Sequence, residues 1–444
     1  MTGSRDAAGL QDEARRRWSA RLALAAAAVA MVLLLVVGGL KSIALLVAGM
    51  AALALAIAGL WWALTHRGAR RLLALGLAAG AVVAVFTGYA LVDLLWVVLT
   101  ALGLWAVAVS AGRAALAGGR SGPTEYPAGP VARPFLIMNP RSGGGKVERF
   151  RLAERARALG AEVALLDPDH HQDVAALARQ AVADGADLLG VAGGDGTQAL
   201  VAGVAAEHGL PFLVISAGTR NHFAMDLGLD RTDPSTCLDA LTDGVELRID
   251  LGLIGDRVFV NNASFGTYAA VVQSPAYRDD KVRTVLEMLP DLLTHQRGPR
   301  LTLRAAGTVV EAPQAVLVSN NPYAPGDPSG LGRRPRMDTG ALGVLGVKVD
   351  TAAEAVGLLM GGAQAAGLTA VAAREVTVDA DAAEVPVGVD GEALTLPTPV
   401  VCRIRPGALR VRVPRHRPGV PQARPPMDWR RLRRIAFPPH GTTG

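Results

Sequence analysis

The chain has 444 residues, of which 50% are hydrophobic, and this length predicts more than one domain. Its net charge of +6 is compatible with a nucleic-acid partner, but the arginines are concentrated at the N-terminus, around apolar segments and in the C-terminal tail, so we expect no nucleic acid to bind. The two cysteines, Cys237 and Cys402, match neither a metal-binding spacing nor a disulfide framework, which makes a reducing compartment the default.

Residues 22–112 are almost entirely apolar and follow a basic N-terminus at residues 1–21. A helix needs about 20 apolar residues to cross a bilayer. We therefore predict a transmembrane domain of four helices, at residues 22–40, 43–64, 72–92 and 94–111, with breaks at Lys41–Ser42, residues 66–71 and Asp93. Because only Asp93 and its neighbours divide the last two helices, a count of three spans stays open. A signal peptide would be shorter, and a soluble bundle would show a polar face.

Arginine is distributed asymmetrically around these spans. Arginines precede the first span, lie between the second and third and follow the fourth, whereas the other two loops offer only Lys41 and Asp93. Since positively charged loops stay on the cytoplasmic side, the pattern predicts an integral membrane protein with both ends in the cytoplasm.

Residues 113–132 are rich in Gly, Pro and Ser, which predicts a linker. Residues 133–246 then alternate between strand-like and helical segments, which predicts a parallel sheet in an α/β domain. The predicted strands are residues 135–138, 163–166, 188–191 and 211–215, and the predicted helices are residues 147–159, 173–184, 198–207 and 234–242.

Short strands and turns dominate residues 247–414, which predicts a mostly β second domain. Its predicted strands are residues 258–262, 300–305, 316–319, 344–349 and 375–378, with a helical interruption at residues 275–295. The tail, residues 415–444, is rich in Arg and Pro. It is either a solvated, disordered segment or a contact with anionic lipid, which attracts each basic residue by about 1 kcal/mol.

The run Gly193-Gly194-Asp195-Gly196-Thr197 follows a predicted strand and precedes a predicted helix. Glycines let the backbone turn tightly and approach a ligand, and the first amides of a helix attract an anion. Asp195 would repel a phosphate on its own, so its presence indicates a cation or a hydroxyl beside it. The run therefore predicts a nucleotide-phosphate site with a magnesium ion or an acceptor as partner.

Two further predicted strands end in polar loops with glycines, at residues 139–146 (NPRSGGGK) and residues 218–224 (GTRNHFA). Because the carboxyl ends of parallel strands form the ligand crevice of an open sheet, we expect the three loops to converge on one site. Lys146 is followed by Val147 rather than Ser or Thr, so this is no Walker A motif, and backbone amides must bind the phosphates.

These motifs resemble those of the diacylglycerol kinase catalytic-domain family, which includes sphingosine kinases and bacterial lipid kinases. The matching segments are residues 139–146, 193–197, 218–224 and 389–392, and the resemblance covers about residues 133–413. It implies an α-helical transmembrane region followed by a two-domain α/β and β fold: a nucleotide domain with a parallel sheet at 133–246, and a β-rich acceptor domain at 247–414.

The resemblance also implies a function: an ATP-dependent lipid kinase of the bacterial cell membrane that phosphorylates the hydroxyl of diacylglycerol or a related lipid. ATP and Mg²⁺ would be its cofactors, and a membrane lipid and the bilayer its partners, with a homodimer left open. Glu392 would be the general base, Asp195 a second catalytic residue, and Asp338 and Asp195 the metal ligands. The residues expected to bind the nucleotide are Asn139, Ser142, Gly143, Gly193, Gly194, Gly196, Thr197, Gly218, Thr219 and Asn221.

Four positions depart from the family pattern. Ala199 and Leu200 replace an Asn-Glu pair, His222 replaces an Asp, and Thr339 replaces a carboxylate of the metal-binding stretch. A catalytically degenerate nucleotide- or lipid-binding protein is therefore one alternative. A soluble-substrate kinase of the NAD kinase type, which shares the Gly193–Thr197 motif, is another, although the membrane spans and the missing Asn-Glu argue against it.

One alternative concerns the predicted base alone. Asp390-Gly391, directly before Glu392, is also a strong hairpin-turn signal, so the late motif would on its own be explained as a turn.

Overall fold

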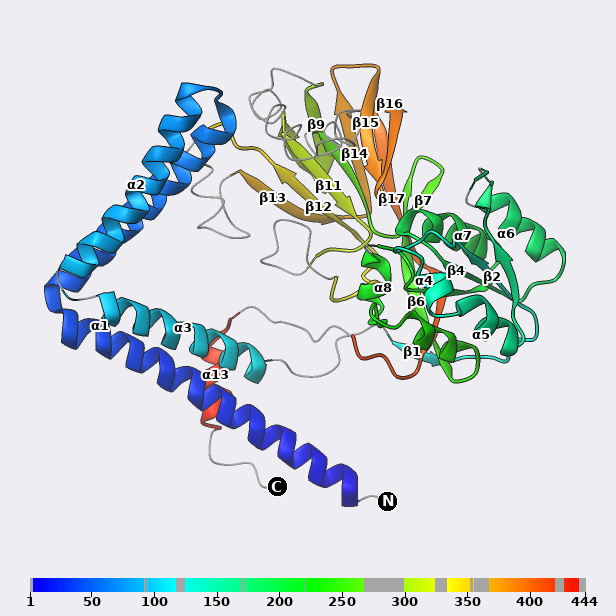
Figure 1. Cartoon of the computed structure of the whole chain (residues 1–444), viewed down its shortest axis with the longest axis horizontal. Helices are drawn as coiled ribbons and strands as arrows, with labels where there is room; N and C mark the ends of the chain where they lie inside the picture. The colour runs from blue at the N-terminus through cyan, green and yellow to red at the C-terminus, as the bar shows by residue number, and fades with distance from the viewer. Residues whose placement is uncertain are drawn as a thin grey trace. The chain divides into compact units, whose positions relative to one another are not determined.

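The structure, a computed structural model, describes residues 3–91, 93, 95–116, 124–167, 169–170, 172–219, 221–266, 299–323, 334–351, 354, 367–419 and 427–438. The chain forms two compact units: Met1–Arg120 with Thr351–Leu359 and Gln422–Gly444, and Ser121–Asp350 with Met360–Pro421. Among the described residues, long helices make up most of the first unit, and both sheets belong to the second (Figure 1). The helix predicted at residues 275–295 lies outside the described residues.

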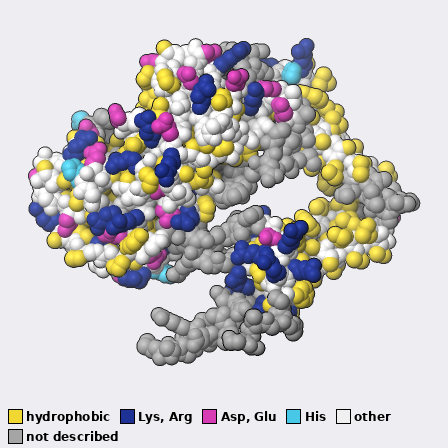
Figure 2. All heavy atoms as spheres, turned by 180° about the vertical axis from the view of Figure 1, so that it is seen from behind, with side chains coloured by type: hydrophobic (Ala, Val, Ile, Leu, Met, Phe, Trp, Pro, Cys, Tyr) yellow, Lys and Arg dark blue, Asp and Glu magenta, His cyan; other side chains and the backbone are white. Residues whose placement is uncertain are grey.

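The first unit is built from α1 (Gly3–Thr65), α2 (Ala69–Leu91) and α3 (Leu95–Leu116), together with α13 (Trp429–Ala436). Four segments of the long helices are long and apolar enough to cross a membrane: Ala14–Val37, Val47–Thr65, Ala69–Leu91 and Leu95–Leu116. Many of their Leu, Val and Trp side chains are exposed, which suits helices surrounded by lipid (Figure 2). Four apolar helical segments of sufficient length are therefore present, as the sequence predicts.

The first two spans differ from the prediction in one respect. We expected a break at Lys41–Ser42, but α1 continues through both residues. Lysine and serine both tolerate a helix, and neither removes a backbone donor as proline would. Where α1 meets α2, a side chain at Gly59 would lie 2.9 Å from the carbonyl oxygen of Ala74, so this glycine permits the two helices to pack closely.

The second unit begins with the predicted α/β alternation. Its parallel strands lie in the order β5 (Pro211–Ile215), β4 (Leu188–Ala192), β2 (Pro134–Met138) and β3 (Glu162–Leu165). The first three of these strands are buried along their whole length, as expected for a sheet covered by helices on both faces. The helices are α4 (Lys146–Arg149), α5 (Leu152–Ala158), α6 (Val174–Ala183), α7 (Asp195–Glu207), α8 (His222–Asp226) and the 3₁₀ helix η1 (Pro234–Leu241).

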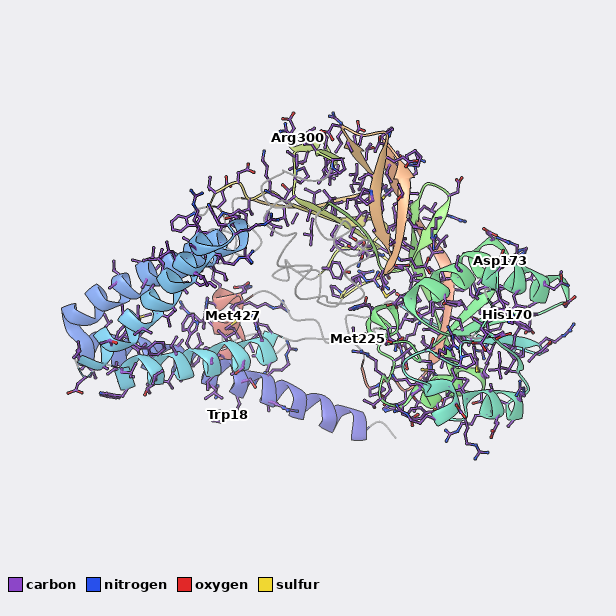
Figure 3. All side chains as sticks on the ribbon, turned by 45° about the horizontal axis from the view of Figure 1, so that its top comes forward. Trp18, His170, Asp173, Met225, Arg300 and Met427 are labelled. Atoms are coloured by element: carbon purple, nitrogen blue, oxygen red, sulfur yellow. The ribbon has the colours of Figure 1, made fainter. Side chains whose placement is uncertain are left out.

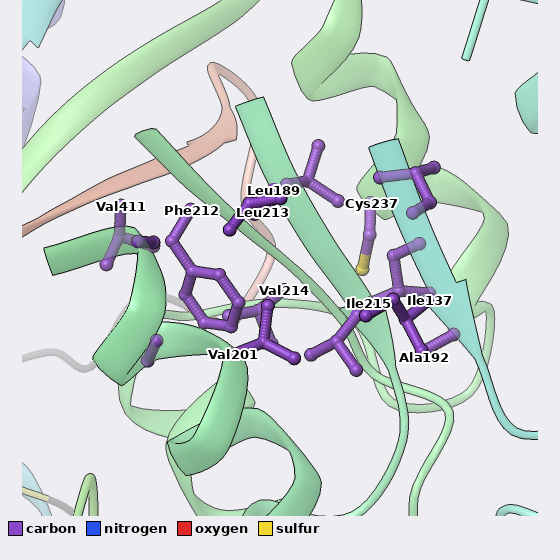
Figure 4. Packing of buried hydrophobic residues seen from close by; sticks show 14 of the residues in the cluster. Ile137, Leu189, Ala192, Val201, Phe212, Leu213, Val214, Ile215, Cys237 and Val411 are labelled. Atoms are coloured by element: carbon purple, nitrogen blue, oxygen red, sulfur yellow. The ribbon is translucent and has the colours of Figure 1, made fainter. Parts of the chain in front are cut away.

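The core of this half lies between the parallel sheet and its helices. Val201 of α7 packs beside Phe212 and Val214 of β5, and burial of one such side chain stabilises the fold by about 1.5–3 kcal/mol (Figure 4). The single helix predicted at residues 147–159 is in fact two, α4 and α5. The chain breaks at Arg151, whose φ of 53° is left-handed and cannot continue a right-handed helix.

Two long antiparallel strands connect the α/β half to the β half. These are β6 (Gly244–Ile254) and β17 (Val400–Pro414), which pair along most of their length, while β17 also pairs in parallel with β5. The first sheet therefore continues into β14 (Glu375–Ala380), β9 (Leu301–Ala305) and β10 (Thr308–Glu311), and β1 (Glu125–Pro127) and β7 (Arg257–Phe259) pair with β6.

The predicted boundary between residues 246 and 247 thus falls inside a strand. Leu247 of β6 and Val411 of β17 belong to the first core, whereas Ile254 and Cys402 at the other ends of the same strands belong to the second core. The predicted linker also differs, because its residues Glu125–Pro127 form β1.

The second sheet is antiparallel throughout. Its strands lie in the order β13 (Leu368–Ala373), β12 (Leu342–Val347), β11 (Ala315–Ser319), β8 (Asn262–Gly266), β15 (Glu384–Val389) and β16 (Glu392–Pro397). Its buried side chains, such as Phe265 and Val387, pack with Leu303 and Val376 of the first sheet to form the second core. The prediction of a mostly β second domain is confirmed.

Candidate active site

The three glycine-bearing loops meet at the carboxyl ends of β2, β4 and β5. A side chain at Gly143 would overlap the carbonyl oxygen of Ala217, and one at Gly218 would lie 2.8 Å from the carbonyl oxygen of Gly193 and 3.0 Å from Cα of Gly194. Backbone therefore contacts backbone between neighbouring loops. Only glycine fits at these positions, and the predicted convergence of the three loops is observed.

The loop after β2 curls through three successive left-handed glycines. Gly143, Gly144 and Gly145 have φ angles of 57°, 72° and 80°. The amides of Gly145 and Lys146 both donate to the carbonyl oxygen of Ser142 at 3.2 Å, and Asn139 Oδ1 accepts the amide of Arg141 at 3.0 Å. Asn139 thus helps to shape this loop, and Ser142 lies half-buried within it.

Asp195 lies where the N-termini of two helices meet. It is the first residue of α7 and is largely buried, and its carboxylate oxygens lie 3.3 Å and 3.4 Å from the amides of His222 and Phe223, at the start of α8. These contacts are long for hydrogen bonds, so the carboxylate keeps lone pairs for another partner. A carboxylate at a helix N-terminus is stabilised by the helix dipole.

Asn221 directs the third loop. With a φ of 52°, it donates through Nδ2 to the carbonyl oxygens of Ser216 at 2.9 Å and Gly218 at 2.6 Å. Its Oδ1 is buried and has no hydrogen-bond partner among the described residues. An unpartnered buried acceptor is costly, and a ligand donor beside Gly218 would satisfy it. Thr219 is exposed in the same loop, and Thr197 packs against Gly193.

The hairpin between β15 and β16 is the part of the β half that reaches the glycine loops. Asp390 is half-buried, and its carboxylate accepts the amides of Val260, Asn261 and Asn262 at 2.8, 2.8 and 3.0 Å. Burial raises the pKa of Asp390 to about 7, and the negative charge of Asp195 adds to the rise, while the three amides oppose it. The Asp390–Gly391 turn, with φ angles of 48° and 88°, is the hairpin expected of this dipeptide.

Glu392, the residue after that turn, lies over the first turn of α7. A side chain at Gly196 would overlap the Glu392 carboxylate, whose Cδ would be 2.9 Å away. Glu392 also forms an ion pair with Arg257 of β7, and the two side chains are 45% and 33% exposed. The fold therefore brings the two predicted catalytic carboxylates, Glu392 and Asp195, to neighbouring positions at one helix N-terminus.

Sequence reasoning missed two participants in this site. Arg257 gave no signal, because it is 135 positions from Glu392 and belongs to no motif. Asp390 lies inside the Val389–Glu392 motif, but its contact with three amides depends on residues 260–262, which are distant in the sequence.

Asp338, a predicted metal ligand, forms an ion pair with Arg336. Its two carboxylate oxygens accept Nε and Nη2 of Arg336 at 2.8 Å and 3.0 Å, and Thr339 bonds to Asn321 Oδ1. Across the described residues, no group of three or more His, Cys, Asp or Glu side chains could hold a metal ion. Asp195 does fit Mg²⁺, because this ion is commonly held by one or two carboxylates together with substrate phosphates.

The positions that depart from the family pattern lie beside the site. Ala199 is buried and Leu200 half-buried on α7, so the missing Asn-Glu pair is replaced by apolar packing. Gln198, also on α7, donates from Nε2 to the carbonyl oxygen of Gly193 at 3.0 Å. The backbone amide of His222 faces Asp195.

A buried ion pair links α8 to the β half. Arg334 is fully buried and bonds through Nε to Asp226 Oδ2 at 2.7 Å. Its Nη1 donates to the carbonyl oxygens of Val260 at 2.6 Å and Asn320 at 2.7 Å. Because Val260 also donates its amide to Asp390, this pair orders the strand end that supports the Asp390 turn.

Comparison with known proteins identifies the fold. The family model described as "Diacylglycerol kinase catalytic domain" matches residues 133–254. The "Probable lipid kinase YegS-like" of Pseudomonas aeruginosa is 30% identical over 293 residues, which cover 63% of this chain and 94% of that protein. The chain belongs to the diacylglycerol kinase catalytic-domain family.

Other relatives match a shorter part. A diacylglycerol kinase of Bacillus subtilis is 31% identical over 176 residues and one of Mycobacterium tuberculosis 33% identical over 142 residues, so the chain spans only 57% and 46% of their lengths. The crystal structure of a diacylglycerol kinase from Bacillus anthracis aligns with 18% identity and a TM-score of 0.47, covering 64% of this chain and 97% of that one.

Proposed function

We propose that this protein is a membrane-bound lipid kinase that transfers the γ-phosphate of ATP to the hydroxyl of diacylglycerol or a related lipid. The observation that carries the proposal is the position of Glu392, beside Asp195 and over the first turn of α7, where the three glycine loops meet. Membership in the family and the relatives named as diacylglycerol or lipid kinases support the same class of reaction.

The glycine loops are suited to bind the phosphates of ATP. Backbone amides at the N-terminus of α7 and at Gly143 and Gly144 would donate to phosphate oxygens, with the α7 dipole adding to the attraction. Mg²⁺ would neutralise charge on the transferred phosphoryl group, and Asp195 is the residue that would hold it. The unpartnered Oδ1 of Asn221 would accept a donor from the nucleotide.

Glu392 would act on the acceptor. The lipid hydroxyl gives its proton to the Glu392 carboxylate as its oxygen bonds to the γ-phosphorus, and the bond to ADP breaks. Arg257 keeps the carboxylate oriented before the lipid arrives. The four apolar segments would hold the enzyme at the bilayer that contains the lipid, and we propose that the catalytic unit faces the cytoplasm, where ATP is available.

Phosphate transfer from labelled ATP tests the proposal directly. The full chain would be assayed with magnesium in mixed micelles that contain total membrane lipid, beside Glu392→Gln and, as a matched control, Glu384→Gln. Glu384 is an exposed glutamate of the same hairpin. We expect a labelled lipid from wild type and control, and a rate about 10²–10⁴-fold lower for Glu392→Gln.

Two other outcomes would count against the proposal. A rate unchanged in Glu392→Gln would remove this residue as the base. If wild type binds ATP and labels no lipid, the buried Ala199 and half-buried Leu200 that replace the Asn-Glu pair would favour a nucleotide- or lipid-binding protein without turnover.

A further inference from the structure

Arginine side chains gather at one end of the first unit, where α13 lies against α1 and α3. Figure 2 shows Lys and Arg side chains concentrated at this place beside the apolar helices. The exposed arginines there are Arg15, Arg17 and Arg21 of α1, Arg113 of α3, and Arg430, Arg431, Arg433 and Arg434 of α13. We call these eight residues the basic collar.

Apolar contacts fix α13 in this position. Leu432 and Ala436 are buried against Ala20, Ala115 and Leu116. The Trp429 ring lies 5.7 Å from that of Trp105, between centroids. Because this apolar side of α13 is used inside the unit, the four arginines of the helix remain exposed on its other side.

Gly112 of α3 provides the space for this contact. A side chain there would overlap the end of Met427, which Figure 3 labels beside α13, and would lie 3.1 Å from Cδ1 of Leu432. A glycine costs about 1 kcal/mol relative to alanine in a helix interior, so its presence here is consistent with a packing role.

Arginines of α1 bind the ends of the other two helices. Arg16 Nε donates to the carbonyl oxygen of Ala115 at 3.2 Å, and Arg21 Nε donates to that of Ala436 at 3.1 Å. These carbonyls belong to last helical turns, which lack intrahelical donors and carry the negative end of the dipole. The Arg21 guanidinium also lies 5.5 Å from the Trp18 ring and 5.9 Å from the Phe437 ring.

Aromatic residues mark this level as a membrane interface. Trp18 and Phe437 are 68% and 63% exposed, and both lie beside Arg21 of the basic collar. Exposed aromatic rings at the ends of apolar spans are typical of the headgroup region. Asp428, directly before α13, is the N-cap of this helix, and its carboxylate accepts the amide of Arg431.

We infer that the basic collar is a binding site for anionic phospholipids, whose phosphate oxygens are bound by the arginines of α1, α3 and α13. Guanidinium groups pair well with phosphate, and clusters of four to eight basic residues beside a membrane helix attract anionic lipid. The C-terminal helix α13 contributes half of the arginines in the basic collar. Apolar contacts and the hydrogen bond from Arg21 hold it in position.

Lipid binding to the full chain in a neutral detergent tests the inference without using phosphate transfer. Native mass spectrometry would follow the binding of dioctanoyl phosphatidylglycerol and, for comparison, dioctanoyl phosphatidylcholine. The collar variant replaces Arg430, Arg431, Arg433 and Arg434 by Gln. The control replaces four exposed arginines of the second unit, Arg155, Arg179, Arg304 and Arg374, by Gln.

We expect wild type and control to bind the anionic lipid in preference to the neutral one, and the collar variant to lose about tenfold or more in affinity for it. Wild-type affinity in the collar variant would overturn the inference. An equal loss in the control would also overturn it, because attraction would then follow net charge alone.

Gly112→Leu tests whether the position of α13 matters. This variant keeps every arginine and replaces glycine by a better helix former, but it fills the space taken by Met427 and Leu432. Faster trypsin cleavage after the α13 arginines would report that the helix has been displaced. We expect affinity for the anionic lipid to fall with it, and unchanged affinity after displacement would contradict a site assembled from three helices.

Discussion

The candidate site depends on a few carboxylates that share one helix N-terminus. Asp195 begins α7, Glu392 lies over Gly196, and Asp390 lies close enough to Asp195 for the negative charge of Asp195 to raise the pKa of Asp390. Each has a separate stabilising partner: two α8 amides, Arg257 and three backbone amides, respectively. These partners let like charges occupy a small volume.

Arg257→Gln should lower kcat for phosphate transfer by about tenfold, because a charge-assisted hydrogen bond of about 1.5 kcal/mol no longer orients Glu392. Steady-state assays would separate kcat from KM for the lipid, and Arg257→Lys should recover part of the rate. An equal loss in Arg304→Gln, which changes an exposed arginine of β9, would contradict a specific role for Arg257.

Gly218→Ala should weaken nucleotide binding and lower the free energy of unfolding by about 1–3 kcal/mol, because its methyl group would lie 2.6–3.0 Å from Asn221 Oδ1, Gly193 O and Gly194 Cα. Gly129→Ala is the matched control, since nothing lies within 4 Å of its added carbon. ATP titration and urea unfolding would measure the two effects. Wild-type behaviour of Gly218→Ala would mean that the loops do not pack as described.

Local motifs predicted the glycine loops well, because a strand, a glycine turn and a helix N-terminus are neighbours in sequence. The juxtaposition of Glu392 with Asp195 was available only through resemblance to a family. The engagement of Asp338 by Arg336 was not predicted, although the residues are two positions apart, because motif matching considers each carboxylate without its counter-ion.

At the scale of elements, hydrophobic pattern located the strands of the α/β half and the apolar helices. It failed in two places where backbone conformation or long-range pairing determines the structure. Arg151 divides a predicted helix by adopting a left-handed φ, and β6 crosses the predicted boundary at residues 246 and 247 to pair with β17. Pairing between strands more than 140 positions apart leaves no periodic signal in either one.

Asp226→Asn should lower the free energy of unfolding by about 3–5 kcal/mol, because Arg334 would keep its full charge in a buried position without its counter-ion. Glu375→Gln breaks the exposed pair with Arg403 and should cost less than about 1 kcal/mol. Urea titrations of both variants would compare the two. A similar small cost for both would show that Arg334 is satisfied by its carbonyl partners alone.

At the scale of the whole molecule, β6 and β17 make the α/β half and the β half of the second unit interdependent. Each strand contributes to the first core at one end and to the second core at the other. If either core unfolds, strand edges and apolar side chains of the other core would therefore become exposed to water. The membrane helices form a separate compact unit and share neither core.

The two cores should consequently unfold together. Cys237 lies in the first core and Cys402 in the second, and burial raises their pKa values to about 11 and about 12, so both thiols are inert until their core opens. Thiol labelling at increasing urea should give the same midpoint for both. Reaction of one cysteine well before the other would contradict cooperative unfolding.

Trp105 and Trp429, which contact each other, belong to a set of tryptophans whose location has a spectroscopic consequence. All six tryptophans of the chain, at positions 18, 61, 62, 96, 105 and 429, belong to the first unit, and none to the second. Tryptophan fluorescence, excited at about 295 nm, therefore reports on the helices of the first unit alone. The unmodified protein thus carries separate optical and chemical reporters for its two units.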